Sequence, residues 1–201
     1  MARRLLGIGC ESTRPDVVSS ITAPGTPDTY RGDELWFFAL VDPDNRRPVD
    51  YDDRERLLGE LEKTIGLDGN RQLDAADPRL KLRILRRGLD SRRAHPELFG
   101  RGEYRPLEVR GELADHLIAF ARSHDAEHAI VLAPRLLASV IGPEGRLPAW
   151  KDTHVVLPAE LGGLHFRSAL TNDEHRIAEA PLTLGVSAVL SKLPLALLLS
   201  T

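Results

Sequence analysis

Cysteine is nearly absent from this chain of 201 residues, where Cys10 is the only one. A single cysteine excludes an internal disulfide and a zinc site built from cysteines, and it favours a reducing compartment, so the expected location is cytoplasmic. Seven histidines are present, but none has the short spacing to a carboxylate or a cysteine that zinc sites use. We therefore expect no metal and no other cofactor.

Strong net charge and long apolar runs are also lacking. The formal net charge is −3 and arginines are interleaved with acidic residues, so there is no basic field and no nucleic-acid partner is expected. Near the N-terminus, the apolar run LLGIGC is shorter than the roughly 7–15 residues of a signal segment. The apolar stretch 182–199 is interrupted by serine, lysine and proline and falls short of the ~20 residues of a membrane helix. We expect no membrane segment.

Motifs of common enzyme classes are missing as well. The sequence has no GxSxG nucleophile elbow, no GxGxxG fingerprint and no phosphate-binding loop. Aromatic residues make up only 5% of the chain, which argues against a strong stacking platform for sugars. With 42% hydrophobic and 28% charged residues, the composition is that of a globular protein that can bury a core in one domain or two small ones.

The most informative stretch is 23–51, which reads APGTPDTYRGDELWFFALVDPDNRRPVDY. It contains four prolines and no helical period, which predicts a structured loop rather than a helix. Within it, Thr26 to Tyr30 is long enough for a short strand, Gly32 allows a turn, and Asp42-Pro43-Asp44-Asn45 has the residues of a rigid turn.

The polar side chains of this loop suit a sugar ligand. Carboxylates and guanidiniums hydrogen-bond hydroxyls, and aromatic rings pack on the apolar face of a sugar. On composition the residues available to a polar partner are Asp33, Glu34, Asp42, Asp44, Asn45, Arg46 and Arg47, with Tyr30 and Trp36 as flat surfaces. The alternative is a salt-bridged surface loop that only connects two elements.

The same loop resembles a known family. PGTPDTYRGDELW and LVDPDNRRPVDY are similar to the segment after the last barrel strand in the maltooligosyltrehalose synthases, members of the α-amylase superfamily of glycoside hydrolases. The resemblance continues through KLRILRRGLDSRRAHPELFGRGEYRPLEV and DHLIAFAR, and so covers most of the chain from about Ser20. Arg31 stands where the family usually has Gln, and Phe37 where it usually has Asp. Residues 1–15 have no family counterpart.

The resemblance implies an activity and a site. Family enzymes convert the reducing-end α-1,4 linkage of a maltooligosaccharide into an α,α-1,1 linkage in trehalose biosynthesis, an isomerase reaction. Their catalytic carboxylates lie on earlier barrel strands, so no catalytic residue is assigned here and the chain alone is expected to be inactive. By resemblance the residues beside the sugar are Tyr30, Arg31, Glu34, Trp36, Asp42, Asp44, Asn45, Arg46 and Arg47.

The implied partners are a maltooligosaccharide or α-glucan and a separate chain that carries the rest of the barrel. Two other functions stay open. One is a non-catalytic α-glucan-binding module. The other is an assembly module that recruits a partner through the unpaired strand at 26–30.

Helix signals follow the loop. Asp52 and Glu55 have capping-box spacing, which predicts a helix near 52–65, and Asp77-Pro78 predicts the start of a second helix at 78–94. By resemblance, residues 16–21 end the seventh barrel helix. Together with loop 23–51, these elements form a predicted region 1–99, the truncated end of a catalytic barrel.

From residue 100 onward the pattern changes to short strands. The predicted strands are 104–109, 116–121, 129–133, 154–157, 166–170, 176–180, 182–190 and 195–199. Their spacing suits an antiparallel β-sandwich over 100–201. The predicted fold class is therefore α+β, in which the last βα portion of a (β/α)8 barrel and two helices precede a C-terminal antiparallel β-sandwich domain.

Overall fold

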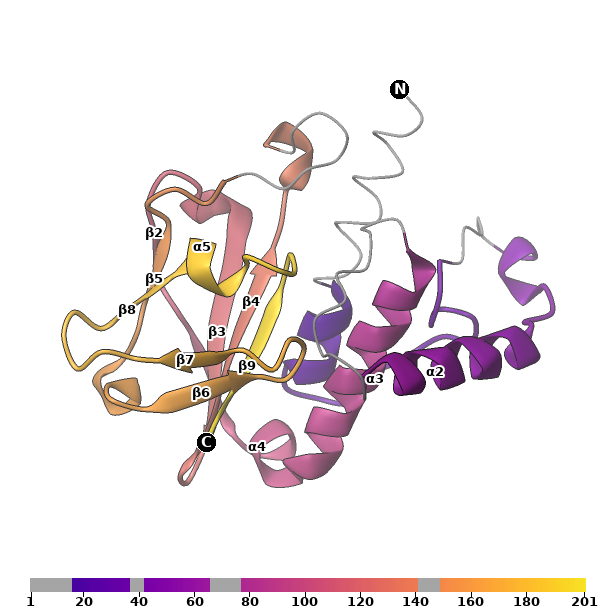
Figure 1. Ribbon diagram of the computed structural model, residues 1–201, viewed down its shortest axis with the longest axis horizontal. Helices are drawn as coiled ribbons and strands as arrows, with labels where there is room; N and C mark the ends of the chain where they lie inside the picture. Colours follow the sequence, from indigo (N-terminus) through magenta and orange to yellow (C-terminus); the bar gives the residue numbers. More distant parts are fainter. Residues whose placement is uncertain (1–15, 37–41, 66–76, 141–148) are drawn as a thin grey trace.

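A computed structural model describes residues 16–36, 42–65, 77–140 and 149–201. The fold is α+β, with the longer helices on one side and the antiparallel strands on the other (Figure 1). A helical segment covers 16–22. Two long α-helices follow, α2 (Tyr51–Ile65) and α3 (Pro78–Ala94), and two short ones, α4 (Pro96–Gly100) and α5 (Val186–Val189). Single 3-10 turns occur at η1 (Asp44–Arg46), η2 (Ala114–His116), η3 (Leu137–Ser139) and η5 (Ala159–Leu161).

Both predicted helices are confirmed, one of them with a different cap. Asp77 caps α3 as expected, because its Oδ1 accepts a hydrogen bond from the backbone N–H of Arg79 at 2.9 Å. The cap predicted at Asp52 is wrong. Helix α2 begins one residue earlier at Tyr51, and Asp50 Oδ1 accepts from the backbone N–H of Asp53 at 2.9 Å. An aspartate placed three residues ahead of that N–H satisfies it better than one inside the first turn.

The strands form two antiparallel sheets. The six-stranded sheet has the order β1 (Glu103–Pro106), β3 (Leu117–His124), β4 (Glu127–Pro134), β9 (Ala196–Ser200), β6 (His165–Ser168) and β7 (Glu174–Arg176). The three-stranded sheet has the order β2 (Val109–Arg110), β5 (His154–Val156) and β8 (Thr183–Gly185). The last strand in the chain thus lies inside the larger sheet.

Several predicted strands have different bounds. The stretch 104–109 splits into β1 and β2, which belong to different sheets; the split follows Pro106, which has no donor to continue a ladder. The strand predicted at 182–190 is wrong in its second half, because β8 ends at Gly185 and α5 begins at Val186. The strand expected at 176–180 ends at Arg176.

No strand forms over 26–30, contrary to the expectation. Pro27 cannot donate to a ladder, and no strand of the described residues pairs with this segment. The assignment of 1–99 to the end of a barrel stays a prediction.

One core cluster lies between the two sheets. Alternate residues of the central strands point into it, as Ala119 of β3, Leu132 of β4 and Leu198 of β9 do, and they meet Val155 of β5 and Leu184 of β8 from the smaller sheet. The two sheets therefore pack on a shared apolar core, in agreement with antiparallel β-structure over this region. Its description as a β-sandwich domain stays a prediction.

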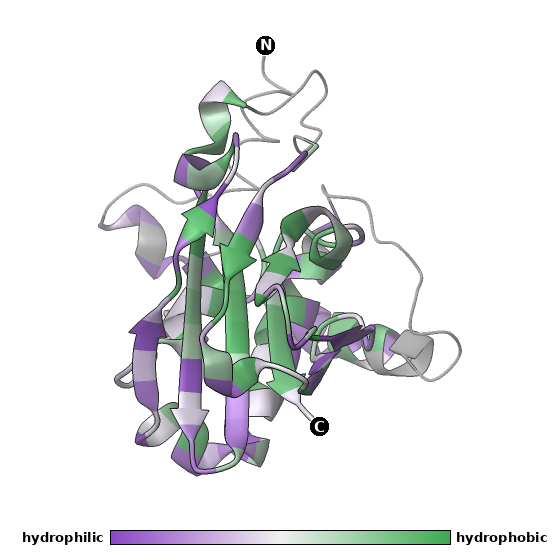
Figure 2. Cartoon of the chain, turned by 90° about the vertical axis from the view of Figure 1, so that its left-hand side faces the viewer, coloured by the Kyte–Doolittle hydropathy of each residue, from purple (hydrophilic) through white to green (hydrophobic). Residues whose placement is uncertain are grey.

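The helices cover the opposite face of the larger sheet. Phe120 of β3 and Val131 of β4 belong to a second cluster, together with Val18, Ile84 and Phe99 from the helical part of the chain. The central strands are consequently apolar on both faces, and they are among the most hydrophobic parts of the chain in Figure 2. The predicted division at residue 99 stays a prediction, since a common core crosses it.

A buried arginine joins the helices to the sheet. The Arg122 side chain of β3 is only 1% exposed. Its guanidinium donates to the carbonyl oxygens of Thr22 at 2.8 Å, Phe99 at 3.2 Å, Gly102 at 2.8 Å and Glu103 at 3.3 Å. Burial lowers the pKa of the Arg122 guanidinium from its ordinary value. Because the four carbonyls come from two stretches of the chain, the one that ends the helical segment 16–22 and the one from α4 to β1, this one side chain ties both stretches to β3.

Candidate functional site

The predicted sugar loop lies beside α2 and α3 (Figure 1). Residues 23–36 and 42–50 of it are described, so Phe37, one of the two departures from the family pattern, lies outside the described residues. The first half turns at Gly32, whose φ of +90° is in the left-handed region that favours glycine. The second half contains η1, which gives the loop one helical turn.

Arg54 of α2 fixes the first half of the loop. Its Nε lies 3.1 Å from Glu34 Oε2, and its Nη2 donates to the carbonyl oxygen of Gly32 at 3.1 Å. Its Nη1 donates to the carbonyl oxygen of Asp50 at 2.8 Å. One guanidinium therefore joins the turn at Gly32 to the last residues of the loop, and its charge-assisted hydrogen bonds are stronger than neutral ones.

Lys81 of α3 fixes the segment that follows. Its side chain is 2% exposed, and its Nζ donates to Asp33 Oδ1 at 2.7 Å and to the carbonyl oxygen of Leu35 at 3.3 Å. The same Nζ lies 5.5 Å from the centroid of the Trp36 ring, within the range of a cation–π contact. A buried ammonium ion is stable here because a carboxylate, a carbonyl and a ring face surround it.

The two halves of the loop meet at Arg31 and Arg46. Arg31 Nη2 donates to the backbone carbonyl of Arg46 at 3.2 Å, although the two residues are 15 positions apart. Within the second half, Arg46 forms an ion pair with Asp42, and Arg47 Nε lies 3.0 Å from Asp44 Oδ1. Five of the nine candidate residues are thus engaged with one another, as a group of three (Arg31, Arg46 and Asp42) and a pair (Arg47 and Asp44).

The candidate residues differ in how they face solvent. Tyr30 is 49% exposed, and the Arg31, Arg46 and Arg47 side chains are exposed as well. The remaining carboxylates Asp42 and Asp44 lie beside their arginine partners, and Asn45 lies in η1. The outer face of the loop therefore presents a ring, guanidiniums and carboxylates, the groups expected to meet a sugar.

Glu34 and Trp36 occupy the inner side of the loop. Both are partly buried, the Glu34 carboxylate is engaged by Arg54, and the Trp36 ring lies against Lys81. As placed, these two side chains hold the loop against the helices. The assignment of all nine residues to substrate binding stays a prediction.

Sequence reasoning missed Arg54 and Lys81 as residues that position the loop. Lys81 did carry a signal, because it stands between Leu80 and Leu82 on a helix whose apolar stripe is buried. A lysine in such a place needs a partner. Arg54 carried none, since arginines on an acidic helix surface are common.

The part of the chain that the structure describes contains neither a metal site nor a membrane-spanning helix. No group of three or more histidine, cysteine or acidic side chains there is arranged to hold a metal ion. No described helix has the length and apolar character needed to cross a membrane.

Comparison with known proteins gives the relatives of this chain. No family model matches the chain. A Mycobacterium tuberculosis protein named "Putative maltooligosyl trehalose synthase" is 43% identical over 139 residues, which are 69% of this chain. The chain is related to the maltooligosyltrehalose synthases. A solved structure of maltooligosyltrehalose synthase from Arthrobacter ramosus agrees, with 35% identity over 96% of this chain and a TM-score of 0.73.

The chain is similar to only a part of a maltooligosyltrehalose synthase. It spans 15% of the length of the mycobacterial relative and 22% of the Arthrobacter protein. An α-amylase structure from Anoxybacillus is also similar, with 19% identity over 94% of this chain and a TM-score of 0.57, which shows a shared fold. The fold is thus found in α-amylase-type enzymes, and the chain corresponds to a portion of such an enzyme.

Proposed function

We propose that the chain is a C-terminal portion of a maltooligosyltrehalose synthase and that its loop 30–47 binds maltooligosaccharide in the cytoplasm. One observation carries the proposal. The inner side of the loop is held by Arg54 and Lys81, while Tyr30, Arg31 and Arg46 stand exposed on the outer side. A preorganised polar surface loses little conformational entropy when it binds a ligand.

Each exposed group has a role in this proposal. The Tyr30 ring packs on the apolar face of one glucose unit, and the arginines donate hydrogen bonds to hydroxyl groups. The hydrogen bond from Arg31 to the Arg46 carbonyl keeps the two halves of the loop at a fixed separation. Arg31, where the family usually has Gln, therefore offers a guanidinium that donates to the loop backbone and to the ligand.

Catalysis is assigned to residues outside this chain. The family enzymes interconvert α-1,4 and α,α-1,1 linkages with carboxylates carried on earlier barrel strands, and the chain spans 22% of the Arthrobacter relative. Glycoside chemistry needs two carboxylates about 5–9.5 Å apart on a rigid scaffold. We therefore propose that the isolated chain binds the glucan without isomerising it, and that a separate chain with the missing barrel strands restores activity.

Calorimetric titration of the chain with maltopentaose tests binding. We expect saturable binding to the wild-type chain, and a loss of about tenfold in affinity for Tyr30→Ala and for Arg46→Ala, since a residue that carries binding costs more than 1 kcal/mol when truncated. Arg101→Ala is the matched control, because Arg101 on the other side of the helical region is 78% exposed and has one ion pair, to Glu97. Unchanged affinity in both loop variants would contradict the proposal.

An assay for trehalose-terminated product tests whether the isolated chain is inactive, as proposed. Binding without product is the expected result. Product from the isolated chain would mean that catalytic carboxylates lie within it, and the proposed division of labour would be wrong. Binding that persists with no gain of activity on addition of the missing barrel strands would favour the non-catalytic α-glucan-binding module instead.

A further inference from the structure

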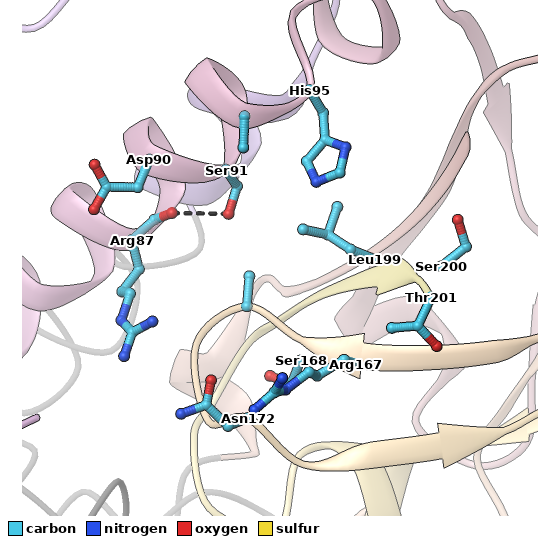
Figure 3. A pocket seen from close by; sticks show the side chains of 12 residues that line it. Arg87, Asp90, Ser91, His95, Arg167, Ser168, Asn172, Leu199, Ser200 and Thr201 are labelled. Carbon is cyan, nitrogen blue, oxygen red and sulfur yellow. Dashed lines mark hydrogen bonds between the residues drawn. The ribbon is translucent and has the colours of Figure 1, made fainter. Parts of the chain in front are cut away.

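A cavity lies away from the sugar loop, between α3 and the larger sheet. Its volume is about 400 Å³. One wall is the last part of α3 with its C-cap, including Arg87, Ser91 and His95, and the other is the β6 end of the sheet with Arg167 and Asn172. Figure 3 shows the Arg87 side chain reaching from α3 towards the turn that carries Asn172, while Arg167 lies on the sheet wall.

Two guanidiniums line this cavity without an ion-pair partner among the described residues. Among the described residues, neither Arg87 nor Arg167 has a side-chain ion pair or hydrogen bond. A further guanidinium, that of Arg83, lies one turn earlier on α3. Burial, and secondly the positive charge of Arg87, lower the pKa of Arg83. Two unpaired cations on facing walls favour an anion between them.

Two carboxylate side chains near these guanidiniums, Asp90 of the cavity lining and Glu127, pair with other cations. Asp90 Oδ2 lies 2.8 Å from Arg86 Nε, and Glu127 Oε1 lies 2.6 Å from His95 Nδ1. Both acids are therefore occupied by other partners, and the Arg87 and Arg167 charges stay available to a ligand.

The sheet wall of the cavity is rigid. The turn after β6 is closed by the backbone N–H of Asn172, which donates to the Ser168 carbonyl at 2.9 Å, and by the N–H of Thr171, which donates to Ser168 Oγ at 3.1 Å. Asn172 has a φ of +63°, a left-handed conformation that asparagine tolerates. The turn therefore holds the Asn172 amide at the cavity, where it can serve a polar ligand.

We propose that this cavity binds a small phosphomonoester, with the phosphoryl group held between the guanidiniums of Arg87 and Arg167. A guanidinium fork matches the oxygens of a phosphoryl group and forms paired, charge-assisted hydrogen bonds with it. The cavity volume of about 400 Å³ exceeds that of a phosphate ion and leaves room for a hydroxylated organic part beside Ser91 and Asn172. No residue of the sugar loop lines the cavity, so the two sites are separate.

Titration with glucose 6-phosphate, inorganic phosphate and glucose tests the site on the full chain. We expect glucose 6-phosphate to bind most tightly, phosphate at least fivefold more weakly, and glucose not at all. Arg87→Gln and Arg167→Gln should each lower the affinity at least tenfold, and added NaCl should weaken binding. Arg176→Gln is the matched control, since Arg176 is exposed on the adjacent strand β7 and does not line the cavity.

The outcomes separate the possible ligands. Equal affinity for phosphate and glucose 6-phosphate would mean that the site recognises an inorganic anion alone, and the assignment to a phosphomonoester would be wrong. No binding to the wild-type chain, or unchanged binding in the Arg87→Gln/Arg167→Gln double variant, would overturn the site itself. Maltopentaose affinity is expected to be the same in all these variants, so failure here is distinct from failure of the proposed function.

Discussion

The two sides of this molecule are held together by different forces. In the sheet region, the central strands β3, β4 and β9 are buried on both faces by apolar side chains. In the region of the loop and α2, the apolar cluster is small, with Leu57, Leu61 and Leu82 as its buried members. What orders the loop instead is a set of polar contacts from Arg54 and Lys81.

This difference suggests how stability is distributed. Apolar burial contributes about 25 cal/mol per Å² and adds up over the whole core of the sheet region. The loop depends instead on a few polar contacts from Arg54 and Lys81, and a single hydrogen bond contributes only about 1 kcal/mol net. The sheet region should therefore unfold last, and the loop should open in local fluctuations. Regions of low local stability are where ligand-binding surfaces are commonly found.

The sharpest test compares a core residue from each side. Phe166 of β6 is 1% exposed in the cluster between the sheets, and Leu57 of α2 is 9% exposed in the small cluster. We expect Phe166→Ala to lower the free energy of unfolding by about 3–5 kcal/mol and Leu57→Ala by about 2 kcal/mol. Urea unfolding followed by circular dichroism measures both. Leu136→Ala, at a side chain 67% exposed, is the control, and equal losses in the two core variants would contradict the comparison.

Arg122 tests whether the two sides unfold together. Arg122→Met removes the donors to four backbone carbonyls at the junction, and we expect a loss of about 3 kcal/mol because buried acceptors are left without partners. Helical and sheet signals should then unfold at different urea concentrations. Arg101→Met, at a side chain 78% exposed, should change stability by less than about 0.5 kcal/mol. Coincident transitions in Arg122→Met would show that the apolar core alone couples the two sides.

Lys81 tests whether polar contacts order the loop. Lys81→Met keeps most of the buried stem but loses the bond to Asp33, which is 52% exposed and can be rehydrated. We expect a small global loss, about 1 kcal/mol, with a clear local effect. Amide hydrogen exchange over 32–36 should quicken while exchange in β4 stays slow, and Trp36 fluorescence should change. Unaltered exchange in the loop would mean that the Arg54 contacts are sufficient.

The helix cap at Asp77 is expected to make a small contribution to the free energy of unfolding, and this contribution depends on pH. The hydrogen bond from the Arg79 side chain, opposed by burial and aided by the Arg79 backbone N–H, lowers the pKa of Asp77. Since the folded pKa is below the unfolded value of about 3.9, the stabilisation is present above that pH and is lost as the pH falls through the folded pKa.

We therefore expect Asp77→Ala to cost about 1 kcal/mol at pH 7 and nothing at a pH below the folded pKa. Thermal unfolding of both proteins across this range gives the difference. Asp90→Ala is a suitable comparison, because Asp90 lies in the last half of α3 and caps no helix. A pH-independent cost for Asp77→Ala would assign the loss to packing rather than to the charged cap.

Local signals predicted much of this fold. Asp77-Pro78 predicted the start of α3 because a cap and a proline act within one turn. Apolar runs predicted β3, β4 and β9. The helix α5 was missed because an apolar stretch as short as 182–190 has no decisive period, and the strand at 26–30 failed because pairing depends on a neighbour that the segment itself does not specify.

The loop also shows that local sequence does not specify contacts with distant residues. Its polar composition predicted which side chains would be available to a ligand; Tyr30 and Arg46 are exposed, whereas Glu34 and Trp36 are partly buried. Its support came from distant positions: Lys81 is 48 residues from Asp33. Such contacts follow from how the helices pack, which single-sequence patterns do not contain.

The position of β9 has a consequence for the order in which the protein is made. Strand β9 pairs with β4 on one side and β6 on the other. The hairpins β3–β4 and β6–β7 can each form early during synthesis, yet they become one sheet only when Ala196–Ser200 inserts between them. Until then both hairpins expose an unpaired apolar edge, which is the state in which nascent chains aggregate or require a chaperone.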